Sequence, residues 1–209
     1  DNSVLHTFTV LAGHSIDSLQ KVFINDKALT LGSSTSSATV NGETVHTVTE
    51  SFFTNTDNPN NLGSGRLIRF TFHDGTQTAV DGFAQAQLNT TSVPNTHIFK
   101  NCAYVYMQMV YDSEKLPNFP NISFEVKGKK LFDPRTSETA FTDSNGNVIG
   151  NNPALVLRDI LTDTSYGVGV TSSEINDTTN AGGFAAAANT CEQTVTLADG
   201  STTEQRYEC

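Results

Sequence analysis

The sequence predicts an α+β fold that is predominantly β, with β-barrel or β-sandwich domains followed by a smaller helix-containing part. Two observations carry this prediction. Apolar and polar residues alternate repeatedly through the first 150 positions, as expected for strands with one buried face. Beyond residue 150 the apolar spacing becomes that of amphipathic helices. We therefore expect a β-rich domain over 1–150 and a helix-containing domain over 151–209. We expect the second to be incomplete at its C-terminal end, because the strand-like segment 202–207 stops just before the last residue, Cys209.

Five stretches of the first part have strand character. Alternating apolar and polar residues occupy 4–11, 68–73 and 122–127. The stretch 19–29 is interrupted by Asn25-Asp26, which predicts a hairpin with a two-residue turn. Residues 102–111 are apolar or aromatic at nearly every position, so we expect a central strand with both faces covered.

Loops and turns separate these strands. Residues 32–42 are small and polar and predict a flexible surface loop. Residues 143–147 (DSNGN) resemble the oxygen-rich start of a calcium loop, but Ala154 stands where such a loop carries its bidentate acid. We therefore interpret Asn145-Gly146 as a hairpin turn.

Two helices are expected in the second part. Asn152 followed by Pro153 supplies an N-cap and a first-turn proline, and apolar residues then lie on one face, which predicts a helix over 153–162. Helical spacing returns in the alanine-rich stretch 184–191. Asp199-Gly200 then indicates the turn of a closing hairpin.

Composition excludes several classes of function. The chain carries 12 Lys and Arg against 22 Asp and Glu, a net charge of −10, and its densest basic cluster is only Lys127, Lys129 and Lys130. Specific nucleic-acid binding is therefore not expected, because it requires a basic surface. A run of about 18 apolar residues, which a membrane span needs, is absent from the sequence. The three cysteines are too few and too widely spaced for a disulfide scaffold or a four-cysteine zinc site.

The sequence contains no motif of a known catalytic or metal site. Nucleophile elbows and phosphate-binding glycine loops are absent, and no two of the five histidines have the spacing of a helical metal pair. His73 beside Asp74 could act as a general base, but it lies on the polar face of a strand just before a turn, so we interpret it as a solvated surface residue. We expect no enzymatic activity, no cofactor and no metal site.

Two motifs, K-G-K-K-L-F-D-P-R at 127–135 and N-P-A-L at 152–155, carry a family resemblance. With the stretches 97–112, 120–136, 151–170 and 184–209, they resemble the central region of siphophage tail-tip host-specificity proteins, the protein J family of lambda-like phages. The residues of the motifs that we interpret as structural are Lys127, Gly128, Lys129, Asp133, Pro134, Arg135, Asn152, Pro153, Ala154, Leu155, Tyr166 and Gly167. The chain departs mildly from the family pattern at Phe132, where Tyr is usual, and in the inserted residues 143–150.

The resemblance implies a structural role in a virion. Members form a trimeric hub that closes the tail tube and links it to receptor-contacting fibre parts during host attachment and DNA ejection. The implied partners are other copies of the chain, other tail-tip and tail-tube proteins, the tape-measure protein and, through distal parts, a host receptor. The chain is then an internal fragment of a protein made in the host cytoplasm and located at the phage tail tip. Residues 30–65 resemble the family least, and we expect an inserted loop or subdomain there.

Two other functions remain open on sequence grounds. A carbohydrate- or receptor-binding β module is suggested by the loops 32–42 and 55–65, which are rich in Asn, Ser and Thr donors. A hydrolase domain is the weaker alternative, because the sequence shows no recognisable nucleophile or metal set.

Overall fold

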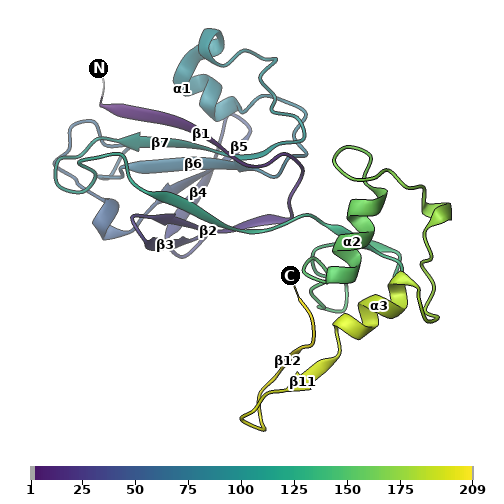
Figure 1. The fold of residues 1–209 in the computed structure, drawn as a ribbon. Coiled ribbons are helices and arrows are strands. Elements are labelled where there is room, and N and C mark those ends of the chain that lie inside the picture. The colour runs from purple at the N-terminus through teal and green to yellow at the C-terminus, as the bar shows by residue number, and fades with distance from the viewer. Residues whose placement is uncertain (1–2, 209) are drawn as a thin grey trace. The chain divides into compact units, whose positions relative to one another are not determined.

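A computed structural model describes residues 3–208, and the chain forms two compact units, Asp1–Lys127 and Gly128–Cys209 (Figure 1). The α+β, predominantly β fold class is confirmed. The division lies at Lys127/Gly128, earlier than the boundary near residue 150 that composition suggests. The physical reason is a shared core. Leu131 and Ile149 pack in the same apolar cluster as Leu155, so residues 128–150 belong with the helices that follow them.

The first unit contains two antiparallel sheets. The larger has the order β1-β7-β6-β5-β4, formed by Val4–Ala12, Ala103–Val110, Ile68–His73, Glu43–Val48 and Thr35–Val40. The smaller has the order β3-β2-β8, formed by Lys27–Thr30, Ser18–Ile24 and Ile122–Lys127. The two sheets pack into a sandwich, and no sheet within residues 3–208 closes into a barrel.

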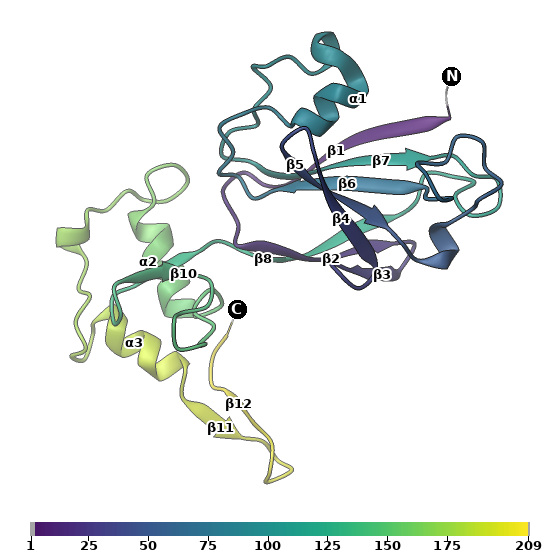
Figure 2. The same ribbon diagram turned by 180° about the vertical axis from the view of Figure 1, so that it is seen from behind.

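Strand β7 is buried on both faces, as its continuous apolar sequence predicts. Its side chains alternate between two cores: Val105, Met107 and Met109 join the apolar cluster between the sheets. Tyr104 and Tyr106 instead face the helix α1 (Gly82–Ser92). Figure 2 shows α1 on one side of the five-stranded sheet and β2, β3 and β8 on the other. The first unit is therefore built in three layers.

Two elements of the first unit differ from the sequence prediction. The predicted flexible loop at 32–42 is wrong for residues 35–40, which form the edge strand β4. Small polar residues suit this position because most β4 side chains are exposed, and Asn41-Gly42 closes the hairpin to β5 with both φ angles positive. Helix α1 is not predicted at all, because few of its residues are buried. Within 30–65, the short helix η1 (Ser51–Phe53) also places Phe53 in the core of the sandwich.

The second unit contains the predicted helices and hairpins, together with three short elements that the sequence does not predict. Its elements are β9 (Leu131–Asp133), β10 (Glu138–Ala140), α2 (Pro153–Thr162), η2 (Ser172–Glu174), α3 (Phe184–Cys191), β11 (Thr194–Thr196) and β12 (Thr203–Gln205). The three that are not predicted are β9, β10 and η2. Both helices and the closing hairpin are confirmed. A bridge between Thr142 and Val148 flanks the predicted Asn145-Gly146 turn. Asp143 closes this turn by accepting hydrogen bonds from Asn147.

Two further observations concern membrane spans and the cysteines. None of the helices between residues 3 and 208 combines the length and the apolar character that crossing a lipid bilayer requires. Cys102 and Cys191 are both unbridged and half-buried, while Cys209 lies outside the described residues.

Candidate functional site

Arg135 of the motif at 127–135 is the centre of a charged network in the second unit, here called the arginine network. Its guanidinium group donates to Asp133 from Nη2 to Oδ2 at 2.6 Å and to Glu192 from Nη1 to Oε2 at 2.5 Å. The Asp133 side chain is 0% exposed, so the arginine fork supplies the neutralisation that a buried carboxylate needs. Hydrogen bonds to Glu192 and Asp133 raise the pKa of Arg135 above its ordinary value. The network joins the end of β9 to Glu192, the C-cap residue of α3.

Lys129 of the same motif forms the second network, here called the lysine network. Its Nζ donates to Asp159 and to Asp163, both at 2.8 Å, and to the Tyr166 hydroxyl at 2.5 Å. The hydrogen bond from Lys129 is the main reason that the pKa of Asp163 falls to about 2. Desolvation opposes the charge on Lys129, but the bonds to Asp159 and Asp163 outweigh it and raise the pKa of Lys129. This network fixes the segment before β9 against α2.

The N-P-A-L motif and Gly167 close the two ends of α2. Asn152 Oδ1 accepts from the Ala154 amide at 3.1 Å, Pro153 occupies the first turn, and Leu155 is fully buried. At the other end, a Cβ on Gly167 would lie 2.0 Å from the Ile160 carbonyl oxygen, so only glycine fits. This close approach lets the Val168 amide donate to that carbonyl at 2.9 Å.

The remaining motif residues connect these features. Lys127 ends β8, where it pairs with Ser18, and Gly128 begins the second unit. Pro134 follows β9, and Phe132 lies under the Arg158 guanidinium at 4.6 Å. Among the motif residues, the structure thus brings Lys129 into contact with Tyr166, and Arg135 into contact with Asp133. Arg135 is also linked to Asn152, because both bind Glu192. Lys127 lies in the other unit.

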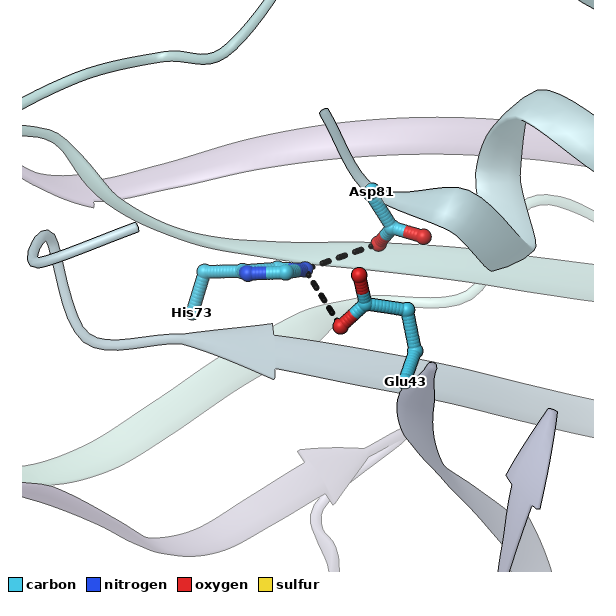
Figure 3. Close-up of side chains that lie close together, drawn as sticks. All are labelled: Glu43, His73 and Asp81. Atoms are coloured by element: carbon cyan, nitrogen blue, oxygen red, sulfur yellow. Dashed lines mark hydrogen bonds and ion pairs between the residues drawn. The ribbon is translucent and has the colours of Figure 1, made fainter. Parts of the chain in front are cut away.

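A second arrangement, in the first unit, is not indicated by any sequence motif. Glu43, His73 and Asp81 form what we call the carboxylate–histidine cluster, and Figure 3 shows the His73 ring pointing between the two carboxylates. His73 Nε2 lies 2.9 Å from Asp81 Oδ2 and 3.7 Å from Glu43 Oε2. The side chains of His73, Asp81 and Glu43 are 9%, 1% and 22% exposed. The cluster is therefore nearly enclosed, with Glu43 on its solvent side.

Three different elements position the cluster. Glu43 begins β5, His73 ends β6, and Asp81 is the N-cap of α1, where its Oδ1 accepts from the Ala84 amide at 2.7 Å. Glu43 Oε1 accepts from the Gly82 amide at 3.2 Å, so both carboxylates lie at the positive end of α1. Strand β5, strand β6 and helix α1 thus meet through these side chains.

The electrostatics of Asp81 reflect its partners. Burial by itself would raise the pKa of Asp81, but hydrogen bonds from His73, Thr71 and the Ala84 amide outweigh burial and lower it. Asp81 is therefore a buried anion held by three donors. The cluster can hold a positive charge between two carboxylates, either as a proton on His73 or as a cation.

The interpretation of His73 as a solvated surface residue is wrong. His73 pairs with Tyr104 across β6 and β7, and this face of the sheet is covered by α1. The error follows directly from missing α1, because the polar face of β6 is solvated only if no helix covers it. Asp81-Gly82 before an alanine-containing segment is the one local signal, that of a helix N-cap, from which the covering helix could have been found.

Comparison with known proteins adds no identification. No protein-family model and no curated protein matches this chain. The resemblance to tail-tip proteins stays a prediction from the sequence, carried by the motifs at 127–135 and 152–155.

Proposed function

We propose that this chain is a structural, non-enzymatic part of a phage tail tip, belonging to the central hub that closes the tail tube. In this role it links the tube to receptor-contacting fibre parts during host attachment and DNA ejection. The observation that carries the proposal is the use of the motif residues. Three of the five charged residues of the motif, Lys129, Asp133 and Arg135, bind one another or residues of the segments around α2 and α3.

This use of charge favours architecture over chemistry. A catalytic acid or base keeps a free position toward a substrate, whereas Asp133 is enclosed and held by the Arg135 fork. Asn152 and Gly167 likewise act on the ends of α2. The resemblance therefore concerns residues that specify a fold, which is what related hub proteins would share.

An exposed apolar surface supports assembly into a larger particle. Leu157 and Ile160, one turn apart on α2, are 51% and 43% exposed, and Val168, bonded to the Ile160 carbonyl, is 68% exposed. Adjacent exposed apolar side chains are typical of protein interfaces. We propose that they contact other copies of the chain in a trimer or neighbouring tail-tip proteins.

Immunoblotting of purified virions from the source tests the proposal. An antibody raised against the chain is expected to detect a band in purified tails, at a mass far above 22.5 kDa, and to label one end of the tail in electron micrographs. Preimmune serum and an antibody against the major capsid protein are the controls. Signal confined to the soluble fraction, with none in particles, would contradict a role in the virion.

The carbohydrate-binding alternative has one structural feature in its favour. A cavity of about 300 Å³ in the first unit is lined by Tyr111, which is 56% exposed, together with polar side chains including Asp57 and Asn60. An aromatic ring beside amide and carboxylate groups can bind a sugar ring. Glycan-array binding that is lost in Tyr111→Ala and kept in Tyr207→Ala, an exposed tyrosine of the other unit, would favour this alternative.

A further inference from the structure

The carboxylate–histidine cluster of Glu43, His73 and Asp81 offers one nitrogen and two carboxylate ligands from three elements. We propose that it binds one divalent first-row transition metal ion, represented by Zn²⁺. Imidazole nitrogen with carboxylate oxygen is a donor set that suits such ions, and three protein ligands leave one position for water. The proposal is independent of the role in a tail tip.

The geometry fits an ion of this size. One potential ligand atom from each residue lies within 4.8 Å of the other two, and two of the three separations are 2.9 and 3.7 Å. Ligands at about 2.1 Å from a tetrahedral zinc ion are about 3.4 Å apart. The separations of 2.9 and 3.7 Å lie on either side of this spacing, so the ligand atoms are at the scale that one such ion requires.

The other atoms of the ligands are already fixed by the fold. Asp81 Oδ1 is held by the Ala84 amide and Glu43 Oε1 by the Gly82 amide, while Asp81 Oδ2 and Glu43 Oε2 face His73. Asp81 Oδ2 also accepts from the Thr71 hydroxyl, which holds that oxygen toward the cluster. These backbone contacts are the outer-shell bonds that orient ligating carboxylates in metal sites. His73 would bind through Nε2 in its unprotonated form, with the ring proton on Nδ1.

Tyr104 packs on the His73 ring of the cluster and carries a buried hydroxyl group. Tyr104 is 1% exposed, and its hydroxyl has no hydrogen-bond partner among residues 3–208. Its ring stacks on His73 at 4.6 Å with an interplanar angle of 13°. Burial, together with the nearby charges of Asp81 and Glu43, raises the pKa of the Tyr104 phenol, so this hydroxyl stays a neutral donor.

Charge and access also favour a cation. With His73 neutral, the cluster carries two negative charges in an enclosed site, where attraction to a divalent ion is stronger than in water. The partly exposed Glu43 lies where an ion would enter. Binding would join β5, β6 and α1, so the ion would stabilise the folded first unit by mass action.

Calorimetric titration of the full chain with Zn²⁺, after removal of metals with a chelator, tests the proposal. We expect one equivalent to bind, with a shift of the His73 ring nitrogens in two-dimensional NMR spectra. Glu43→Gln and His73→Gln, which keep side-chain length and polarity, should each weaken binding at least about tenfold. His46→Gln is the matched control, because His46 lies elsewhere in the same sheet, bonded to Ser37, and it should bind as the unchanged chain does.

Three results would overturn the proposal: no stoichiometric binding to the unchanged chain, binding that leaves the His73 ring resonances in place, or an equal loss in His46→Gln. Circular dichroism checks the fold of each variant. If His73→Gln fails to fold, the partly exposed Glu43→Gln and the direct NMR signal of His73 still decide the outcome.

Discussion

The two units are stabilised by different kinds of interaction. The first buries a large apolar cluster between two sheets and a second, aromatic one under α1. The apolar cluster of the second unit, among the described residues, consists of Leu131, Ile149, Ala154, Leu155 and Ala188. The second unit adds the arginine and lysine networks, which join β9 and its preceding segment to the helices. A small unit cannot bury enough apolar surface to specify its structure alone, so charged pairs complete it.

This difference determines which conditions and substitutions lower the stability of each unit most. In the first unit most of the stability resides in apolar area, which salt does not weaken, and the buried Asp81 carboxylate adds an acid-sensitive contribution. In the second it depends on a buried carboxylate that has one strong partner and on partly exposed ion pairs that screening weakens. The following changes test that contrast, beginning with the largest expected effect.

Truncation of the sandwich core should cost most. Phe70 is fully buried in β6, so Phe70→Ala removes apolar contacts and leaves a cavity. We expect the free energy of unfolding of the first unit to fall by about 3–5 kcal/mol. Urea unfolding followed through NMR signals of the first unit measures this. Phe119→Ala, at a phenylalanine that is 65% exposed, should change stability by no more than about 0.5 kcal/mol. Equal losses in the two variants would disprove the importance of the core.

Removal of Arg135 should be the most damaging charge change in the second unit. Arg135→Ala leaves Asp133, which has no exposed surface, without its guanidinium partner. We expect a loss of about 3 kcal/mol, because an uncompensated buried charge remains. Arg135→Lys should lose less stability than Arg135→Ala, because lysine keeps the positive charge but cannot make the two parallel hydrogen bonds of a guanidinium group. The control is Arg206→Ala, at an exposed arginine bonded to Gln193, and a loss as large there would refute a special role for Arg135.

Local signals account for the parts of the second unit that the sequence predicts. Asn152-Pro153 specifies the start of α2 through one side-chain cap and one fixed φ, and these do not depend on tertiary contacts. The turn at Asn25-Asp26 in the first unit is predictable for the same reason, because both residues adopt the positive φ that such a hairpin needs. The roles of Arg135 and Glu192, 57 positions apart, could not be predicted, although Arg135 itself belongs to the motif.

The features that the sequence does not predict depend on contacts between distant segments. Helix α1 is stable through burial of Phe83 and Ala84 against the sheet, and its own apolar pattern is weak. Once α1 is missed, the burial of His73 is missed with it. The cluster then has no linear signature, because its three residues come from three segments and have no fixed spacing. The cluster forms only because β5 and β6 are neighbours in the sheet and α1 begins next to their ends.

A methyl group at Gly82 should strain the junction that carries the cluster. A Cβ there would lie 2.4 Å from the Asn41 carbonyl oxygen, so the β4–β5 turn and the start of α1 would have to separate. We expect Gly82→Ala to destabilise the first unit by about 1–3 kcal/mol, with faster amide hydrogen exchange in α1. Gly13→Ala, where no other group lies within 4 Å of the added methyl, should shift stability by less than about 1 kcal/mol. Unchanged exchange in α1 would show that the junction tolerates the methyl group.

The acid sensitivity of the second unit is the smallest effect and the finest test of the contrast. The pKa of Asp163 is about 2 in the folded chain, mainly because Lys129 donates to it, and about 4 in an unfolded chain. A lowered pKa stabilises the fold above about pH 4, and this contribution disappears as the pH falls from about 4 to about 2. NMR titration of the Asp163 carboxyl carbon should give a midpoint near 2, and Asp163→Asn should flatten the decrease in melting temperature across that range. Glu204→Gln, at an exposed acid of β12, should leave the decrease unchanged.

High salt should reduce the effect of Asp163→Asn on stability because the Lys129–Asp163 pair is partly exposed, whereas the loss of stability in Phe70→Ala should persist. A midpoint near 4 would mean that Lys129 does not hold Asp163, and the lysine network would then consist of the bonds from Lys129 to Asp159 and Tyr166.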